Sequence, residues 1–596
     1  MLRKHPDLSF CLLLSLFVLF YTLPFLNHAY HIDEPLFLRI AEQIKEHFLD
    51  PYGFNYVWHI ELEPVHQIAG FPPLFAYYLA LIGWNFVYPP EWLIHLSLIP
   101  FSILGVISFY FLARQFDFSA LNSFIAAALF ALCPAYAVSA NMAMPDVAMT
   151  SFSLSALVLA IRGWRKSLIC QSFPHSPSPL MGEGRGEGDS GYKREGIYEL
   201  ILSGVLLGCA TLLRYNAVPM ILILFLFGLT YPSPLPPPQK GGGRVLRASL
   251  PSLIALGMFF LWIFFSQQMY HSSHTSEVLS TFGNANELIR HFWAFNNHLT
   301  LSTLLPLFVL LLVKKNRFFW TLLITFLSLD FALYAAQSQQ VIHFAMWPDV
   351  IFFGLGLSTL IYLGAIFYRE WKQNKFWSFH SVGAIRAAPA SGMESPLQKT
   401  FSLTFEPLTL ERKKYLRWMI LFLWFISIIA IPLFYVMFAS KYLLLALPPL
   451  ILILLAELQK LAKNYLKLCF ALLPVLLILS LSLAHADFLY AKLYRDQAEK
   501  FSKTKRNPNS ELWFVGHWGF QYYMEKVGGL PLAYHYSEEN APEVGDLVVE
   551  SSEASPQPIL SSLEKNLFLI DQSPSSISSH LKIINHDFFT TYLVVE

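Results

Sequence analysis

The segment His31-Ile32-Asp33-Glu34-Pro35 follows the first long apolar run of the chain, residues 8–26. Two adjacent carboxylates therefore lie where a membrane helix would leave the bilayer. Ionisable groups at a membrane boundary are costly unless they are hydrated, paired or used in function. We expect the rest of the chain to form a scaffold of membrane helices around this acidic pair.

The composition is typical of a polytopic membrane protein. Of the 596 residues, 55% are hydrophobic and 14% are charged, whereas soluble domains carry about 25% charged residues. Repeated apolar runs approach the ~20 residues that span a bilayer. The net charge of +1 argues against a nucleic-acid partner, and the lack of a Cys-x-x-Cys pair argues against a disulfide scaffold or a zinc site.

The apolar runs predict an all-α membrane protein with about thirteen transmembrane helices. Lys and Arg recur in alternate connections, which places the N-terminus in the cytoplasm by the positive-inside rule and the C-terminal tail outside. The predicted spans cover residues 8–26, 91–112, 121–138, 147–163, 198–213, 216–231, 248–267, 299–313, 318–336, 349–368, 416–436, 442–457 and 468–486.

We divide the chain into a transmembrane domain, residues 1–486, and a small extracytoplasmic α/β domain, residues 487–596. The tail alternates short apolar runs typical of strands with one helical stretch. The strands are expected at 512–515, 546–550, 568–570 and 592–595, and the helix at 521–526. Three cytoplasmic inserts, at about 172–196, 232–244 and 378–411, are expected to be disordered. The first two are rich in Pro and Gly, and the third shows no hydrophobic pattern.

The first outside loop, residues 27–90, contains two more helical patterns. Leu36, Ile40, Ile44 and Phe48 lie on one face of a helix, which we expect to rest in the membrane interface. A second apolar stretch, residues 74–88, is expected to be a re-entrant or interfacial helix instead of a span.

Asp33 and Glu34 allow two interpretations. An acidic residue before a proline suits the start of a helix, where it caps free N–H groups. A carboxylate at the membrane surface also suits a general base that deprotonates an acceptor hydroxyl. The two interpretations are compatible, because a cap would fix the side chain that acts.

Other polar residues are predicted on the same outer face. Asp146 begins the fourth span, where it is either an N-cap or part of the site. Cations that reach lipid headgroups or bind a donor phosphate are few on this face. The candidates are Arg214, Arg290 and Lys441, together with His343 before the tenth span.

Two further features carry weaker expectations. The segment Gly516-His517-Trp518-Gly519-Phe520-Gln521-Tyr522-Tyr523 is aromatic and could stack on a sugar, but we favour the interpretation that it forms the core of the tail domain. His271 and His274 are spaced to meet on a helix, yet no third ligand accompanies them. We therefore expect no cofactor and no metal, with metal dependence left open.

The order of these motifs resembles glycosyltransferase family 39. The resemblance rests on the acidic pair, the Pro72-Pro73-Leu74 run in the same loop, and the Met144-x-Asp146 turn. The run from Lys441 to Pro448, KYLLLALP, is similar to a motif near the end of such chains. The group includes protein O-mannosyltransferases, lipid A aminoarabinose transferases and RgtA-like bacterial enzymes.

The resemblance implies a GT-C fold and transfer of a sugar from a polyprenyl phosphate, with inversion at the anomeric carbon. It implies that Asp33 is the base and that Glu34 is its partner or a ligand of the acceptor. Asp146 would contact the sugar or order the site, and Lys441, Arg214 and Arg290 would stabilise the leaving phosphate. Phe71 is a departure, because many relatives have Lys there.

We therefore expect a glycosyltransferase of the bacterial inner membrane that acts on an extracytoplasmic lipid or glycan. A flippase or transporter of lipid-linked glycans is the main alternative, although transporters tend to show internal repeats and polar residues at the midplane. An oligosaccharide ligase or polymerase would share the lipid-phosphate donor and stays open as well.

Overall fold

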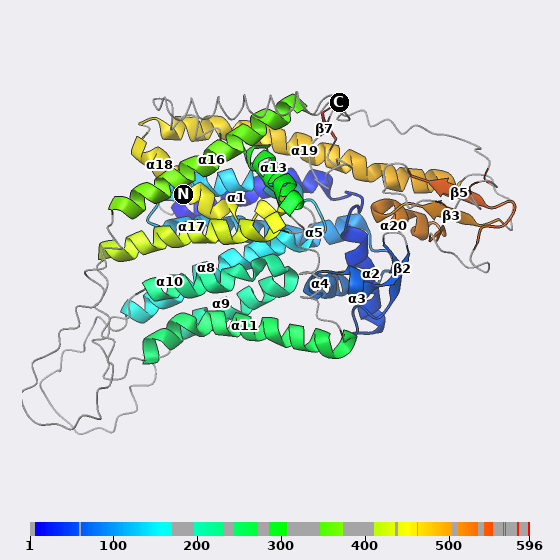
Figure 1. Ribbon diagram of the computed structural model, residues 1–596, viewed down its shortest axis with the longest axis horizontal. Coiled ribbons are helices and arrows are strands. Elements are labelled where there is room, and N and C mark those ends of the chain that lie inside the picture. The colour runs from blue at the N-terminus through cyan, green and yellow to red at the C-terminus, as the bar shows by residue number, and fades with distance from the viewer. Residues whose placement is uncertain are drawn as a thin grey trace, which may run out of the picture.

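The computed structural model is mostly helical (Figure 1). The predicted span at 318–336 lies outside the described residues, as do the end of the span at 299–313 and nearly all of the three inserts. The described residues are 6–58, 61–169, 196–231, 242–271, 285–301, 303–306, 346–373, 410–434, 439–461, 463–503, 510–533, 541–551, 559, 564, 567, 581–582 and 594–595.

Seven described helices are long and apolar enough to cross a bilayer, and three shorter apolar helices accompany them. The prediction of a helical, multi-pass membrane protein is confirmed, whereas the count of thirteen spans stays a prediction. The long helices are α1 (Pro6–Thr22, continued by η1, Leu23–Phe25), α5 (Glu91–Gln115), α8 (Pro145–Ile169), α11 (Gly242–Tyr270), α16 (Met346–Gln373), α17 (Leu410–Phe434) and α19 (Tyr465–Ser502). The shorter ones are α6 (Ala120–Ala131), α9 (Ile197–Leu213) and α10 (Pro219–Thr230, preceded by η3, Tyr215–Ala217).

Short elements join these helices near the site. They are α7 (Pro134–Ser139) between α6 and α8, α13 (Ala285–Leu301), η4 (Ser440–Leu443) and α18 (Leu447–Leu461). Pro134 and Pro145 each begin a helix, a position where a proline loses no hydrogen bond. The turn between α7 and α8 therefore lies between the end of α7 at Ser139 and the proline that begins α8, directly before Asp146.

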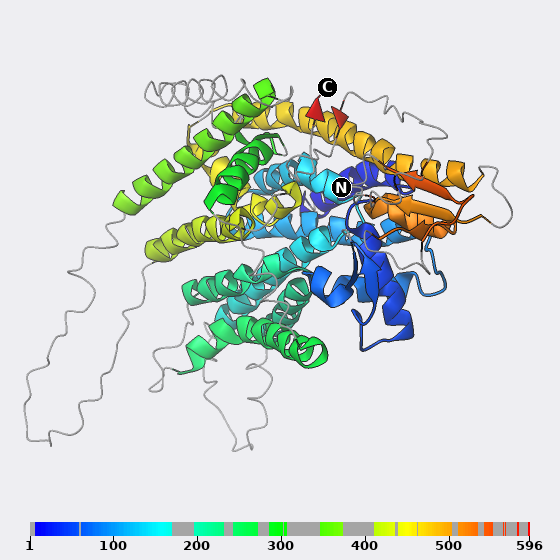
Figure 2. The ribbon, with the colours of Figure 1, turned by 45° about the vertical axis from the view of Figure 1, so that its right-hand side comes forward.

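The segment between η1 and α5 forms a compact layer at one end of the helix bundle (Figures 1 and 2). It contains α2 (Glu34–Glu46), a hairpin of β1 (Asn55–Val57) and β2 (Leu62–Pro64), α3 (Val65–Ile68) and α4 (Leu74–Ile82). With nine residues, α4 is too short to span a bilayer. Leu36, Ile40 and Ile44 are buried against the protein core, so this face of α2 packs on protein, whereas Phe48 is exposed. The expectation that the helix lies in the membrane interface stays a prediction.

The first part of the tail, drawn in orange, lies at the same end of the molecule (Figure 2). Strands β4 (Leu530–Pro531), β3 (Leu512–Val515) and β5 (Leu547–Glu550) form a parallel sheet in that order. Helix α20 (Trp518–Lys526) connects β3 to β4. The described residues also contain an antiparallel pair, β6 (Leu581–Lys582) and β7 (Val594–Val595). Helix α19 continues through residue 486, where we predicted the domain boundary, and the strand predicted at 568–570 lies outside the described residues.

Small residues allow the membrane helices to approach closely, as is common where lipid offers no hydrophobic driving force. A Cβ atom on Gly204 of α9 would lie 2.7 Å from Ile254 Cβ and 2.8 Å from the Pro251 carbonyl oxygen of α11. A Cβ atom on Gly257 of α11 would have no other atom within 4 Å. The two glycines therefore differ only in what surrounds them.

This difference predicts opposite effects of one substitution. Gly204→Ala should lower the melting temperature of the purified protein, because overpacking costs about 1–3 kcal/mol. Gly257→Ala should leave it unchanged or raise it, because alanine is favoured over glycine in helices by up to about 1 kcal/mol. Thermal melts of both variants in one detergent would test this, and equal shifts would contradict the packing of α9 on α11.

Candidate active site

Asp33 occupies the N-cap position of α2, but its side chain makes no capping hydrogen bond. Instead, Lys441 Nζ of η4 donates a hydrogen bond to Asp33 Oδ2 over 3.2 Å. The two residues are 408 positions apart in the sequence. Asp33 is thus a partner of a distant cation, and simple capping does not account for its side chain.

A second ion pair lies beside the first. Arg214, which separates α9 from η3, donates from Nη2 to Asp146 Oδ2 over 3.3 Å. Met144 connects the two pairs, because its Sδ atom lies 3.6 Å from Lys441 Nζ and 3.9 Å from Arg214 Nη2. The arrangement is a cluster of two carboxylates and two cations around one thioether, which we call the four-charge centre.

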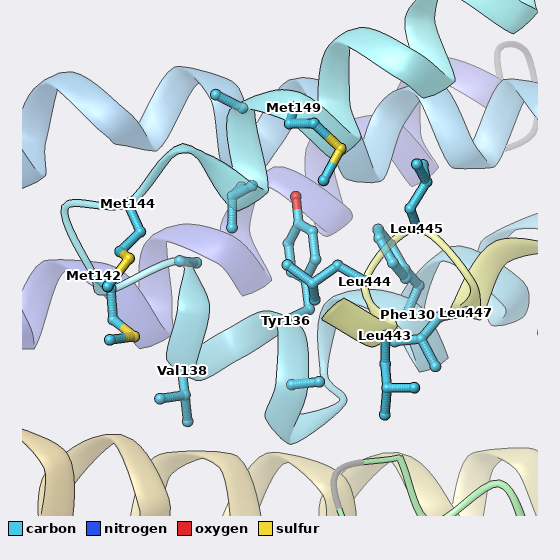
Figure 3. Packing of buried hydrophobic residues seen from close by; sticks show 14 of the residues in the cluster. Phe130, Tyr136, Val138, Met142, Met144, Met149, Leu443, Leu444, Leu445 and Leu447 are labelled. Atoms are coloured by element: carbon cyan, nitrogen blue, oxygen red, sulfur yellow. The ribbon is translucent and has the colours of Figure 1, made fainter. Parts of the chain in front are cut away.

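Hydrophobic packing holds this centre in place. Figure 3 shows Met142 and Met144 on the turn before α8, and Leu443, Leu444, Leu445 and Leu447 on the segment that follows Lys441, with Tyr136 of α7 between these groups. All of these residues are buried. The turn that carries Asp146 and the segment that carries Lys441 are therefore parts of one apolar core.

The four side chains differ in exposure. Asp146 is 1% exposed and Lys441 7%, whereas Arg214 is 13% and Asp33 is 30% exposed. Burial alone would raise the pKa of Asp33, but Lys441 and Arg214 outweigh it and hold the pKa below its ordinary value. Asp33 is therefore an ionised carboxylate and the most accessible member of the centre.

Tyr442 belongs to the same electrostatic environment. Burial raises the pKa of its hydroxyl above the usual value, an effect that Arg214 opposes and the carboxylates of Asp33 and Asp146 reinforce. The phenol therefore stays protonated beside the four-charge centre.

Glu34 is fully buried and acts on the backbone. Its Oε2 accepts a hydrogen bond from the His31 N–H over 2.7 Å, and its Oε1 accepts one from the Ala143 N–H. One side chain thus connects the loop before α2 to the turn before α8. Burial raises the pKa of Glu34 despite the opposing effects of His31, His28 and the two N–H groups. The expectation that Glu34 is the partner of Asp33 or a ligand of the acceptor stays a prediction.

Helix α20 packs directly on the loop that precedes Asp33. A Cβ atom on Gly519 would lie 2.2 Å from the Tyr30 carbonyl oxygen, so only glycine allows this approach. The Tyr523 hydroxyl accepts a hydrogen bond from the Tyr30 N–H over 2.9 Å. Phe520 and Tyr523 are 2% exposed, which assigns the aromatic segment of the tail to the core, as favoured from the sequence.

The backbone is strained on both sides of this contact. Ile32 has φ of 51°, and Trp518 has φ of 60°. Positive φ is rare for bulky residues and is a genuine outlier for a β-branched one. The strain at Ile32 lies immediately before Asp33, where the surrounding contacts must hold it.

The structure brings together four of the seven predicted site residues, Asp33, Asp146, Arg214 and Lys441. Arg290 is part of α13, but its side chain is not among the described ones, and His343 lies outside the described residues. Phe71, where relatives carry Lys, packs on Phe37 with ring centroids 4.3 Å apart.

Three features of the site escaped the sequence analysis. The contact of Met144 with both cations, the position of Tyr442 beside the centre, and the backbone contacts of Glu34 were not expected. Met144 and Tyr442 are neighbours of predicted residues, which was the only available signal. Nothing in the sequence links Glu34 to Ala143, which is 109 residues away.

No protein-family model and no curated protein matches the chain. Several solved structures are similar at low identity. The Archaeoglobus fulgidus oligosaccharyltransferase tethered with an acceptor peptide is 13% identical with a TM-score of 0.45, and the match covers 89% of this chain and 64% of that one. ArnT from Cupriavidus metallidurans bound to undecaprenyl phosphate is 12% identical with a TM-score of 0.38, covering 88% and 85%.

A third similar structure is the S. cerevisiae protein O-mannosyltransferase Pmt1-Pmt2 complex bound to the sugar donor, at 15% identity and a TM-score of 0.31, covering 45% of this chain and 34% of that one. These enzymes have the GT-C fold, the group that the sequence resembles. The chain spans 64% of the length of the oligosaccharyltransferase. Since all three TM-scores are below 0.5, we base the function on the geometry of the site.

The contacts of Glu34 predict a loss of stability on amide substitution. Glu34→Gln offers one oxygen in place of two, so one of the two buried N–H groups loses its acceptor. Such a loss costs about 1–3 kcal/mol, and the melting temperature should fall. Glu46→Gln, at the exposed end of the same helix, is the matched control and should melt as the wild type does. A Glu34→Gln variant that melts at the same temperature as the control would contradict the role of Glu34 as acceptor for the two backbone N–H groups.

Proposed function

We propose that this protein is a membrane glycosyltransferase that moves a sugar from a polyprenyl-phosphate donor to an extracytoplasmic lipid or glycan acceptor. The observation that carries the proposal is the four-charge centre, in which an accessible, ionised carboxylate lies beside two partly buried cations. This combination supplies a base for an acceptor hydroxyl and positive charge for a phosphate.

Asp33 is the proposed general base. It is the most exposed of the four charged side chains, so an acceptor hydroxyl can reach it. Its capping position fixes the backbone, while its side chain is free of capping hydrogen bonds and points to Lys441. Glu34 then acts as a positioning residue, because it holds the loop through backbone N–H groups and does not reach solvent.

Lys441 and Arg214 are the proposed ligands of the donor phosphate. Both contact Met144 Sδ, so one phosphate near that atom could meet both charges. Arg290 and His343 stay candidate phosphate ligands from the sequence. Asp146 orients Arg214 through Oδ2, and among the described residues its buried Oδ1 accepts no hydrogen bond. That free acceptor suits a sugar hydroxyl.

The proposed step is a single displacement. Asp33 takes the proton of the acceptor hydroxyl as its oxygen forms a bond to the anomeric carbon from the face opposite the phosphate. The bond between the anomeric carbon and the phosphate oxygen breaks, and polyprenyl phosphate leaves with the electron pair. Lys441 and Arg214 stabilise the new negative charge, so no general acid is required, and the configuration inverts.

The proposal also includes the location, orientation and domain division expected from the sequence. The enzyme would lie in the bacterial inner membrane with a cytoplasmic N-terminus and would present the site and the tail to the outer face. The chain would divide into a catalytic membrane domain to residue 486 and an extracytoplasmic domain from residue 487. The close packing of α20 on the Asp33 loop supports a tail that acts together with the site.

Replacing the proposed base tests the reaction directly. In proteoliposomes with labelled polyprenyl-phosphate sugars, Asp33→Asn should reduce release of polyprenyl phosphate by about 10²–10⁴-fold, the usual contribution of a general base. Asp117→Asn, at an exposed aspartate after α5, is the matched control and should keep wild-type turnover. A melt of each variant verifies folding.

Two outcomes would contradict the proposal. Equal turnover in a folded Asp33→Asn variant would remove Asp33 from the reaction. Absence of turnover with every donor, combined with movement of labelled lipid between leaflets, would replace the transferase by a flippase.

The ion pair also predicts a pH effect. Because Lys441 lowers the pKa of Asp33, Asp33 stays ionised at acidic pH, and the acidic limb of kcat/KM lies below the usual carboxylate range. Lys441→Met removes this cation, so the pKa of Asp33 rises and the limb should move to higher pH by about 1–3 units. Lys492→Met, on the exposed side of α19, is the control. A limb that keeps its position in Lys441→Met would show that another group titrates.

A further inference from the structure

A second buried polar cluster lies next to the Asp33 loop. His28 and His31, in the loop after η1, meet Asp487 of α19. His28 Nε2 lies 3.0 Å from Asp487 Oδ2, and His31 Nε2 lies 3.2 Å from Asp487 Oδ1. The histidine side chains are fully buried and that of Asp487 is 1% exposed. None of the three can touch a substrate, so the cluster needs another explanation.

A hydrogen-bonded network accounts for only part of the cluster. His28 Nε2 and Asp487 Oδ2 form a hydrogen bond, and His31 Nε2 and Asp487 Oδ1 form an ion pair over 3.2 Å without good hydrogen-bond geometry. The Nδ1 atoms of both histidines are without a partner among the described residues. Leaving one buried polar group unpaired costs about 1–3 kcal/mol, so several in one place indicate a missing partner.

The geometry and chemistry of the donors fit a metal ion. One donor atom from each residue can be chosen so that all lie within 4.8 Å of one another. Zinc bonds of ~2.0–2.1 Å in a tetrahedron separate neighbouring donors by about 3.3 Å. The two imidazoles lie 3.0 and 3.2 Å from different oxygens of Asp487, so a small shift of the carboxylate would bring one oxygen and both imidazoles around a common ion. Two imidazoles and one carboxylate are typical of zinc and related transition metals, whereas Ca²⁺ and Mg²⁺ prefer oxygen donors only.

We propose that His28, His31 and Asp487 bind one divalent transition-metal ion of the zinc class. The ion joins the loop to α19 across 459 residues of sequence. His31 is two residues before Asp33, and its N–H is the donor to Glu34. The ion therefore positions the Asp33 loop from its buried side, next to the strained Ile32. This site rests on its own donors and stands whether or not the proposed transferase reaction is correct.

Metal content and stability test the site without an activity assay. Wild-type protein purified in detergent, loaded with Zn²⁺ and freed of excess ion, should contain about one zinc per chain by elemental analysis, as expected for three ligands with a fourth position left for water. A chelator should remove the ion and lower the melting temperature, and added Zn²⁺ should restore it, since a ligand of the folded state stabilises it.

Variants separate ligation from general destabilisation. Asp487→Asn should lose the bound zinc and the response of the melt to chelator. His485→Gln, two residues away on the exposed side of α19, should keep both. His31→Cys supplies another zinc ligand and should retain metal, whereas His31→Phe should not.

Two results would overturn the proposal. Wild-type protein that retains no stoichiometric zinc and melts identically with chelator and with Zn²⁺ would leave the cluster as a polar network. Zinc retained equally by wild type and Asp487→Asn would place the ion elsewhere. The wild-type measurements decide the question even if a variant fails to fold.

Discussion

The ion pair between Asp33 and Lys441 is the interaction on which the rest of the site depends. Charges near a bilayer are stable only when they are hydrated or paired. Lys441 is 7% exposed and lies within an apolar segment, so it needs a counter-ion. Asp33 provides this counter-ion from the opposite end of the sequence. The pairing holds η4 against the start of α2 and keeps the carboxylate ionised.

The loop before Asp33 is held in its conformation by contacts from several parts of the chain. Glu34 links this loop to the turn that contains Ala143. Tyr523 and Gly519 of α20 contact Tyr30, and Asp487 of α19 contacts His31. These contacts come from three distant parts of the chain. Together they stabilise the positive φ of Ile32, which an isolated loop would not keep. The tail is thus part of the support of the site.

The alternation of Lys- and Arg-rich connections in the sequence selected the four residues of the four-charge centre. Asp33, Asp146, Arg214 and Lys441 were selected because alternate connections place them on one face, and the structure pairs them. Which carboxylate meets which cation could not be predicted, because sidedness does not order helices within the bundle. The helical pattern of Leu36, Ile40 and Ile44 agrees with α2. The pattern could not show that this face packs on the protein core, since an apolar face packs equally well on membrane or on protein.

The contacts that depend on long-range packing escaped the sequence. Glu34 resembled a second catalytic acid because its backbone donors are invisible in the sequence. His28, His31 and Asp487 form no local metal motif, because 459 residues separate the first from the last. The core role of the aromatic segment in α20 agreed with the prediction, whereas the close approach of Gly519 to Tyr30 was not foreseen.

We propose that the four-charge centre holds the phosphate of a lipid-linked donor. The most direct measurement is an experimental structure of the protein in nanodiscs with bound polyprenyl phosphate. The account predicts phosphate oxygens at about 2.7–3.2 Å from both Lys441 Nζ and an Arg214 guanidinium nitrogen, with Asp33 beside them and open to the acceptor. A phosphate bound away from both cations would contradict the account.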